Sequence, residues 1–279
     1  MIKPFGAWLG AALFACSAAA QAVTITYNDF SSTSGLTING NAAQVGNVLR
    51  VTPANFGQAG SVFSTNPISL ASNVSFSTAF QFRFTNPGGA CDGQGCGADG
   101  LVFIVQTNSN SVGGAGGGIG YFGVPNSVGI EFDTWNNGFG DANSSNHVGI
   151  NVGGSVNSLA LIPVSPDMND GNIWYAWVDY NGASNLLEVR LNTTSTRPSA
   201  PLLALTRNLA TDLGSTNAFV GFSSGTGAAY ANHDVLSWTF VDAFAPINVP
   251  TPSAVPEPGT LALGALALTA LGFTRRKRD

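Results

Sequence analysis

Short runs of β-branched and aromatic residues recur along the chain, separated by clusters of Gly, Asn, Ser and Pro. No stretch carries the long apolar period of 3.6 residues that marks an amphipathic helix. Residues 75–84 alternate phenylalanines with mostly polar side chains, which is typical of a strand with one buried face. The pattern predicts an all-β antiparallel sandwich in which an Asn181-Gly182 turn forms one hairpin. The predicted strands are residues 74–84, 100–106, 127–134, 147–152, 174–180, 186–191, 218–223 and 235–241.

Residues 1–22 depart from this pattern. They carry one early charge at Lys3, continue as an apolar run and end in Ala20-Gln21-Ala22. Small residues at those two alanine positions are what signal peptidase accommodates, so the segment predicts a signal peptide with Val23 as the mature start. A buried N-terminal helix is the alternative interpretation of the same residues.

The C-terminal region has three distinct parts. Residues 247–254 predict an extended Pro/Ser/Thr linker. Residues 255–279 begin with Val-Pro-Glu-Pro, continue as an apolar stretch shorter than the roughly 20 residues of a spanning helix, and finish in an Arg/Lys cluster. This order resembles the PEP-CTERM sorting signal of Gram-negative bacteria. The resemblance implies transient membrane anchorage through residues 260–273, processing by an exosortase-type enzyme, and delivery to the cell surface or the extracellular matrix. A plain membrane anchor is the alternative.

Residues 23–246 remain as one large β domain. Charged residues make up only 9% of the chain. Between residues 23 and 250 there are 13 acidic side chains, five arginines and no lysine, a balance that argues against nucleic acid as a partner. Cys91 and Cys96 form an even pair in an exported chain, which favours a disulfide. A zinc site is the rival, but it would need two further ligands and both histidines are distant in sequence.

The segment from residue 131 to residue 147 holds the densest polar chemistry. Glu131 and Asp133 alternate on a predicted strand and therefore point to the same face. If that face is turned inward, two unpaired carboxylates are costly to bury. No lysine or arginine lies within forty residues of them in sequence, so a metal ion is the simplest source of positive charge.

The spacing of the side chains supports a metal site. Asp133, Asn137 and Asp141 offer oxygens along one short loop, as calcium requires. Glu131 and His147 add a carboxylate and a nitrogen, which suit a transition ion such as manganese. The alternative is a surface loop that is simply acidic and rich in asparagine.

The run from Glu131 to His147 resembles the metal motif of legume-type (L-type) lectins. The resemblance implies a concanavalin-like jelly-roll sandwich of antiparallel sheets. It also implies manganese on Glu131, Asp133, Asp141 and His147, and calcium on Asp133, the Trp135 carbonyl, Asn137 and Asp141. One departure is Ala142, which stands where the family often has a proline after the aspartate.

Three other segments, at residues 98–103, 116–122 and 220–240, resemble the same family in the same linear order. In that family the bond corresponding to Ala98–Asp99 is cis and the calcium site beside it holds it, which implies metal-dependent sugar binding. The aspartate accepts hydrogen bonds from sugar hydroxyls, and a glycine N–H and the calcium-bound asparagine complete the polar contacts. The implied sugar contacts are Asp99, Gly117, Asn137 and the loop residues Gly227, Ala228 and Ala229, with Trp135 or, preferably, Phe139 as the stacking aromatic.

The predicted function is calcium-dependent binding of a glycan or exopolysaccharide, with manganese as a second ion. One alternative is a matrix or adhesion protein that keeps the fold without binding sugar. The other is a glycoside hydrolase, because Glu131 and Asp133 match the start of a Glu-x-Asp-x-x-Glu signature. The third acidic position is Asn136, so the acid/base partner is missing and no enzyme activity is predicted. His233 and Asp234 are interpreted as structural residues at the start of a strand.

Overall fold

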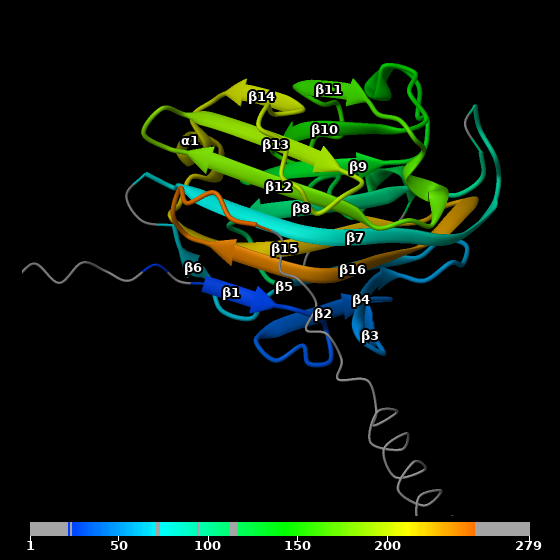
Figure 1. Ribbon diagram of the computed structural model, residues 1–279, viewed down its shortest axis with the longest axis horizontal. Coiled ribbons are helices and arrows are strands. Elements are labelled where there is room, and N and C mark those ends of the chain that lie inside the picture. Colours follow the sequence, from blue (N-terminus) through cyan, green and yellow to red (C-terminus); the bar gives the residue numbers. More distant parts are fainter. Residues whose placement is uncertain (1–21, 23, 71–72, 94, 112–115, 249–279) are drawn as a thin grey trace, which may run out of the picture.

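The computed structural model describes residues 22, 24–70, 73–93, 95–111 and 116–248. Two antiparallel sheets pack face to face, one in front of the other in Figure 1. The first sheet is ordered β14 (Leu203–Thr206), β13 (Leu186–Asn192), β12 (Trp174–Asn181), β7 (Phe76–Gly89), β16 (Ala229–Val241), β4 (Val48–Thr52) and β3 (Ala43–Val45), and β1 (Thr24–Tyr27) also pairs with β16. The second sheet is ordered β11 (Ala160–Pro163), β10 (His147–Val152), β9 (Ser127–Asp133), β8 (Gly100–Gln106), β15 (Asn217–Gly225), β5 (Ala59–Ser64) and β2 (Leu36–Gly40), and β6 (Ile68–Ser69) also pairs with β15. The predicted all-β sandwich is confirmed.

Aromatic rings fill the space between the two sheets. Phe80 on β7 lies 5.9 Å from Phe103 on β8, 5.7 Å from Phe132 on β9 and 5.0 Å from Phe222 on β15, measured between ring centroids. All four side chains are fully or almost fully buried. The alternation in residues 75–84 correctly predicts a strand with one buried face, because the phenylalanines of β7 pack against the second sheet.

The second sheet also carries material on its outer face. Val102, Ile104 and Tyr121 belong to a smaller apolar cluster on the side away from the main core. Loops that contain η1 (Gly116–Gly118) and η2 (Phe139–Asp141) follow β8 and β9, and the short helices η3 (Met168–Asp170) and α1 (Leu209–Leu213) lie elsewhere in connections. This extra layer of loops buries polar residues that a two-layer sandwich would leave in solvent.

One prediction about local structure needs correction. β16 begins at Ala229, so His233 and Asp234 lie inside a strand rather than at its start. The ladder of the neighbouring strand β7, rather than the local residue pattern, sets where this pairing begins. The predicted Asn181-Gly182 turn is present between β12 and β13: the Ser184 N–H donates to the Asn181 carbonyl at 3.2 Å, and Asn185 takes the left-handed position at φ 56°.

The predicted disulfide is present between Cys91 and Cys96 in the connection from β7 to β8. Ala98–Asp99 is a cis peptide bond, as the family resemblance implies. In the described ranges, no helix has the length and apolar character needed to cross a membrane. The predicted signal peptide and the predicted anchor at residues 260–273 lie outside those ranges, apart from Ala22.

His233 makes the fold sensitive to acid. Its ring is fully buried, with Nδ1 2.7 Å from the Thr52 hydroxyl and Phe84 packed edge-on at 4.6 Å. Burial lowers the pKa of His233 from 6.5 to about 3. In the unfolded chain His233 therefore binds a proton below about pH 6.5, whereas in the folded chain it does so only below about pH 3. The free energy of unfolding therefore does not depend on His233 above pH 6.5. Between pH 6.5 and about pH 3 it falls by about 1.4 kcal/mol for each pH unit of acidification.

We expect His233→Gln to reduce the loss of unfolding free energy between pH 6.5 and pH 4.5 by about 2 kcal/mol, because the variant has no imidazole to protonate. Urea unfolding of both proteins in EDTA measures this difference without interference from bound cations. Equal slopes of unfolding free energy against pH in the two proteins would show that His233 does not titrate in this range.

Candidate functional site

Three neighbouring strands of the second sheet bring their ends together at one place. Asp133, the last residue of β9, pairs in register with Gly100 at the start of β8 and with His147 at the start of β10. Asp99 precedes Gly100, and its carbonyl accepts a 2.9 Å hydrogen bond from the Thr134 N–H. Residues that are far apart in sequence thus meet because antiparallel pairing aligns one strand's end with its neighbours' beginnings.

The face that carries Glu131 and Asp133 is not the one that packs against the first sheet. Ile130 and Phe132 take the core side, so the two acids lie on the outer face of the second sheet. They are nevertheless only 2% exposed each, because loops cover that face. The two side chains therefore do not point into the core between the sheets, as the sequence interpretation had them. They are nevertheless buried, so the cost of removing their charges from water remains.

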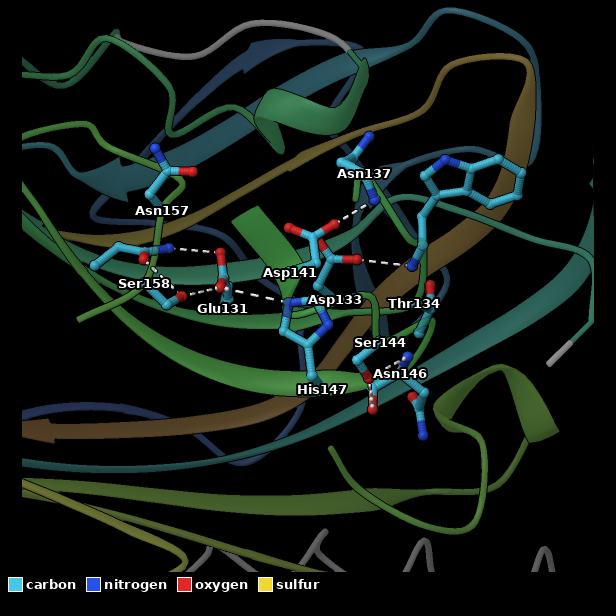
Figure 2. Close-up of polar contacts among 12 residues, drawn as sticks. Glu131, Asp133, Thr134, Asn137, Asp141, Ser144, Asn146, His147, Asn157 and Ser158 are labelled. Atoms are coloured by element: carbon cyan, nitrogen blue, oxygen red, sulfur yellow. Dashed lines mark hydrogen bonds and ion pairs between the residues drawn. The ribbon is translucent and has the colours of Figure 1, made fainter. Parts of the chain in front are cut away.

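Asp133, Asp141 and His147 form a compact buried group, which Figure 2 shows with their side chains directed toward one another. One ligand atom from each of the three lies within 4.8 Å of the others. Asp133 Oδ1 accepts a 2.7 Å hydrogen bond from the Trp135 N–H, and Asp141 accepts one from the Asn137 N–H. The loop backbone therefore orients both carboxylates toward the imidazole.

Glu131 stands beside this group and is fixed by two residues that sequence analysis missed. Its Oε1 lies 3.6 Å from His147 Nε2, and its two oxygens accept hydrogen bonds from the side chains of Ser158 and Asn151 (Figure 2). Ser158 also lies 2.8 Å from Asn151 Oδ1. The period of two along β10 places Asn151 on the face of His147 and could have indicated it, whereas nothing in the sequence indicates Ser158.

The electrostatics of the group fit a bound cation. Among the residues that the structure describes, no arginine or lysine pairs with Glu131, Asp133 or Asp141. Burial, followed by the charges of Glu131 and Asp141, raises the pKa of Asp133 well above its usual range, and burial also raises the pKa of Asp141. Among the described residues, none makes a hydrogen bond to either ring nitrogen of His147. Several carboxylate oxygens beside such an imidazole are the donor set that calcium and manganese take.

Asp99 lies next to the acidic group on the side of β8. It is 4% exposed, and its Oδ2 atom has no hydrogen-bond partner. Burial, followed by the charge of Asp141, raises the pKa of Asp99 to about 7. A buried acceptor without a partner is costly in a folded protein and indicates a position where a ligand can donate hydrogen bonds.

Glycines border two of the predicted sugar contacts. A Cβ atom built on Gly227 would lie 3.7 Å from Asp99 Oδ2, and one built on Gly117 would lie 2.6 Å from the Asn137 amide nitrogen. Any larger residue at position 117 would push the Asn137 side chain, which is solvent-exposed. The structure thus brings together Gly117 with Asn137 and Gly227 with Asp99, four residues that the resemblance assigns to the sugar site.

The remaining predicted site residues lie close in sequence to these groups. Trp135 is half-buried and its carbonyl belongs to the loop between Asp133 and Asn137. Ala228 is exposed and Ala229 is buried, directly after Gly227. Phe139 lies in η2, and the placement of its side chain is outside what the structure describes.

The disulfide-closed loop supports the same region from outside. Asp92 Oδ2 accepts a 3.0 Å hydrogen bond from the Asn136 N–H, and the Asn136 side chain donates to the Asn143 carbonyl at 3.0 Å. Asn136 therefore holds the loop through hydrogen bonds while its own side chain is uncharged. The position where a glycoside hydrolase signature would carry its third acid has a structural role here.

Comparison with known families gives two matches. The legume lectin domain family matches residues 22–255, and the PEP-CTERM protein-sorting motif matches residues 254–278. Among curated proteins, the L-type lectin-domain containing receptor kinase VIII.1 of Arabidopsis thaliana is 34% identical over 206 residues, which cover 71% of this chain and 27% of the kinase. Receptor kinase IV.1 of the same plant is 28% identical over 250 residues, covering 79% and 35%. The chain spans only about a quarter to a third of the length of these relatives.

Solved structures give the same result for the fold. The lectin from Bauhinia forficata in complex with GalNAc superposes with a TM-score of 0.67 at 25% identity, over 79% of this chain and 98% of that lectin. Basic winged bean lectin with Tn-antigen has a TM-score of 0.66 at 26% identity, with the same coverage of 79% and 98%. The metal-free form of lectin I-B4 from Griffonia simplicifolia has a TM-score of 0.65 at 28% identity, over 78% of this chain and 98% of that lectin.

Proposed function

We propose that this chain, which belongs to the legume lectin family and carries a C-terminal PEP-CTERM sorting motif, binds carbohydrate at a calcium-dependent site beside Asp99. The family consists of non-enzymatic carbohydrate-binding proteins. One observation carries the proposal: within the described residues, the buried Asp99 carboxylate has an oxygen without a hydrogen-bond partner, and the buried carboxylates next to it have no arginine or lysine beside them. The first feature is suited to sugar hydroxyls and the second to a cation.

The cation ligands follow from the donor set. Asp133, Asn137, Asp141 and the Trp135 carbonyl would hold calcium, and Glu131, Asp133, Asp141 and His147 would hold manganese. When bound, these ions supply the positive charge that the buried carboxylates otherwise lack. Asn151 and Ser158 then keep Glu131 oriented by hydrogen bonding to its two oxygens.

The sugar contacts come from the rim around Asp99. The Asp99 carboxylate accepts hydrogen bonds from two adjacent hydroxyls, and the Asn137 amide and the Gly117 N–H donate to them. Gly227, Ala228 and Ala229 leave room for the pyranose ring because their side chains are absent or small. Phe139, in the loop that carries Asn137, is the residue that we assign to stacking on the apolar face of the sugar.

Export and display follow from the sorting motif. The PEP-CTERM motif implies an exosortase-processed protein at the cell surface. Single lectin sites of this shallow kind bind weakly, and many copies on one surface strengthen attachment through multivalency. The partner we propose is therefore a glycan or exopolysaccharide at the cell surface or in the extracellular matrix.

A glycan array tests the proposal. We expect the purified chain to bind a subset of glycans in calcium, and we include N-acetylgalactosamine because the Bauhinia lectin structure holds it. EDTA should abolish the signal, and excess calcium should restore it, because the loop that carries Asn137 depends on the cation for its charge balance. No binding to any glycan in calcium would favour an adhesion protein that has kept only the fold, and release of reducing ends would indicate an enzyme.

A further inference from the structure

An exposed aromatic ring stands on a loop that is hydrogen-bonded to the Gly227 segment, and neither the strand pattern nor the family resemblance indicated it. Phe56, in the connection between β4 and β5, is 59% exposed. Its ring packs edge-on against Tyr230 at a centroid distance of 4.8 Å and an interplanar angle of 82°. A large apolar side chain in solvent carries little information by itself, so its position relative to the site decides what it means.

Hydrogen bonds fasten the Phe56 loop to the loop that borders Asp99. The Gly57 N–H donates to the Gly227 carbonyl at 3.2 Å. The Thr226 hydroxyl accepts from the Gln58 N–H at 2.8 Å and donates to the Asn55 carbonyl at 2.6 Å. Gly227 thus contacts the Phe56 loop through its carbonyl and borders Asp99 on its Cα side. The loop lies in the connection after β4, at the end of the sandwich where β16 begins (Figure 1).

Tyr230 supports the Phe56 ring from below. Cβ atoms built on Gly88 and Gly89 of β7 would lie 2.8 Å and 3.1 Å from the Tyr230 ring, so the ring lies flat against backbone that has no side chains. Phe56 is therefore held against a fixed neighbour, while its own surface remains open to solvent. A rigid ring loses little conformational entropy when a ligand packs on it.

The chemistry of this ring selects the kind of ligand. Phe56 offers no hydrogen bond, so it cannot anchor hydroxyls as Asp99 does. An aromatic face does attract the C–H groups on the apolar face of a pyranose, which gain from leaving water. A sugar bound at Asp99 leaves Phe56 available to the next unit of the same chain rather than to that sugar itself.

We propose that Phe56, supported by Tyr230, forms a second subsite that stacks on the sugar unit adjacent to the one bound at Asp99. The ligand class is then an oligosaccharide or polysaccharide chain rather than an isolated monosaccharide. This inference rests on the proposed function, since it assumes that Asp99 holds the first unit.

The test compares Phe56→Ala with the unchanged chain on an array of mono- to hexasaccharides, followed by calorimetry on the best-bound monosaccharide and the best-bound longer glycan. We expect affinity for the longer glycan to fall about tenfold, which corresponds to about 1.4 kcal/mol. Affinity for the monosaccharide should not change. Phe56→Trp keeps an aromatic face and should retain the longer glycan.

Phe244→Ala is the matched control. Phe244 is also an exposed phenylalanine, at 43%, and it follows the far end of β16, a strand of 13 residues that is roughly 40 Å long. We expect this variant to bind every glycan as the unchanged chain does.

The outcomes separate the two proposals. If the unchanged chain binds glycans but Phe56→Ala weakens all of them equally or none of them, the second subsite is wrong while carbohydrate binding stands. If the unchanged chain binds no glycan in calcium, carbohydrate binding itself is wrong and the subsite is rejected with it.

Discussion

Chelation of divalent cations with EDTA is expected to lower the melting temperature of the chain by about 5–10 °C relative to saturating calcium. A cation at 100 times its dissociation constant stabilises the folded state by about 2.7 kcal/mol, and each kcal/mol shifts the melting temperature of a domain of this size by about 2–4 °C. The reason lies in the buried carboxylates of Asp133 and Asp141, which face one another and Glu131 without an arginine or lysine in the described part of the chain. Differential scanning fluorimetry with stepwise addition of calcium measures the shift.

Asp133→Asn is the control for this experiment. The amide keeps the shape of the side chain but removes the central charge of the group. We expect its melting temperature to be insensitive to calcium and EDTA. A wild-type melting temperature that stays the same in EDTA and in calcium would mean that the buried group folds without a cation, and the metal-dependent part of the proposed function would be wrong.

Asp99→Ala is expected to abolish carbohydrate binding while preserving the response of the melting temperature to calcium. The variant removes a buried acceptor whose Oδ2 atom has no hydrogen-bond partner in the part of the chain that the structure describes. Hydrogen bonds to a charged group contribute about 1.5–3 kcal/mol each, so the loss of two corresponds to a decrease in affinity of at least about 100-fold. Calorimetry with the best-bound glycan of the array measures the loss.

Two controls accompany Asp99→Ala. The calcium-induced rise in melting temperature reports whether the fold and the cation group survive, because Asp133, Asp141 and His147 are unchanged. Asp29→Ala removes a carboxylate between β1 and β2, near the end of β16 that lies away from the site, and should bind glycans normally. Glycan binding that persists in Asp99→Ala would remove Asp99 from the proposed site.

The strands with strong alternation were predicted well from sequence. β8 and β10 have the predicted bounds, and β9, β12 and β13 differ from prediction by one residue at one end. β1 to β6, β11 and β14 were not predicted, and each of them has six residues or fewer. Such short strands carry too few residues for a period of two to stand out, and they exist because a neighbouring strand offers them a ladder.

In the candidate site, too, some residues could be predicted from sequence and others could not. Glu131, Asp133, Asp141 and His147 could be found from sequence because they lie on two adjacent strands and the loop between them, where spacing alone brings them close. Ser158 could not be found, since it reaches Glu131 from another segment through loop packing. The Phe56 loop could not be placed either, since hydrogen bonds to residues 226 and 227 position it. The direction in which Glu131 points was also misjudged, because alternation specifies that residues share a face but not which face is covered.

The sequence by itself determined that the chain folds as a β sandwich, that acids and a histidine gather in one segment, and that this segment needs positive charge. These follow from periodicity and composition, which act locally along the chain. Only the tertiary structure decided that the acids lie on the outer face beneath a layer of loops, that Asp99 adjoins them, and that the Phe56 loop is hydrogen-bonded to Gly227. Those facts depend on strand register and loop packing between segments more than a hundred residues apart, such as Gly57 and Gly227, and no local pattern encodes such long-range contacts.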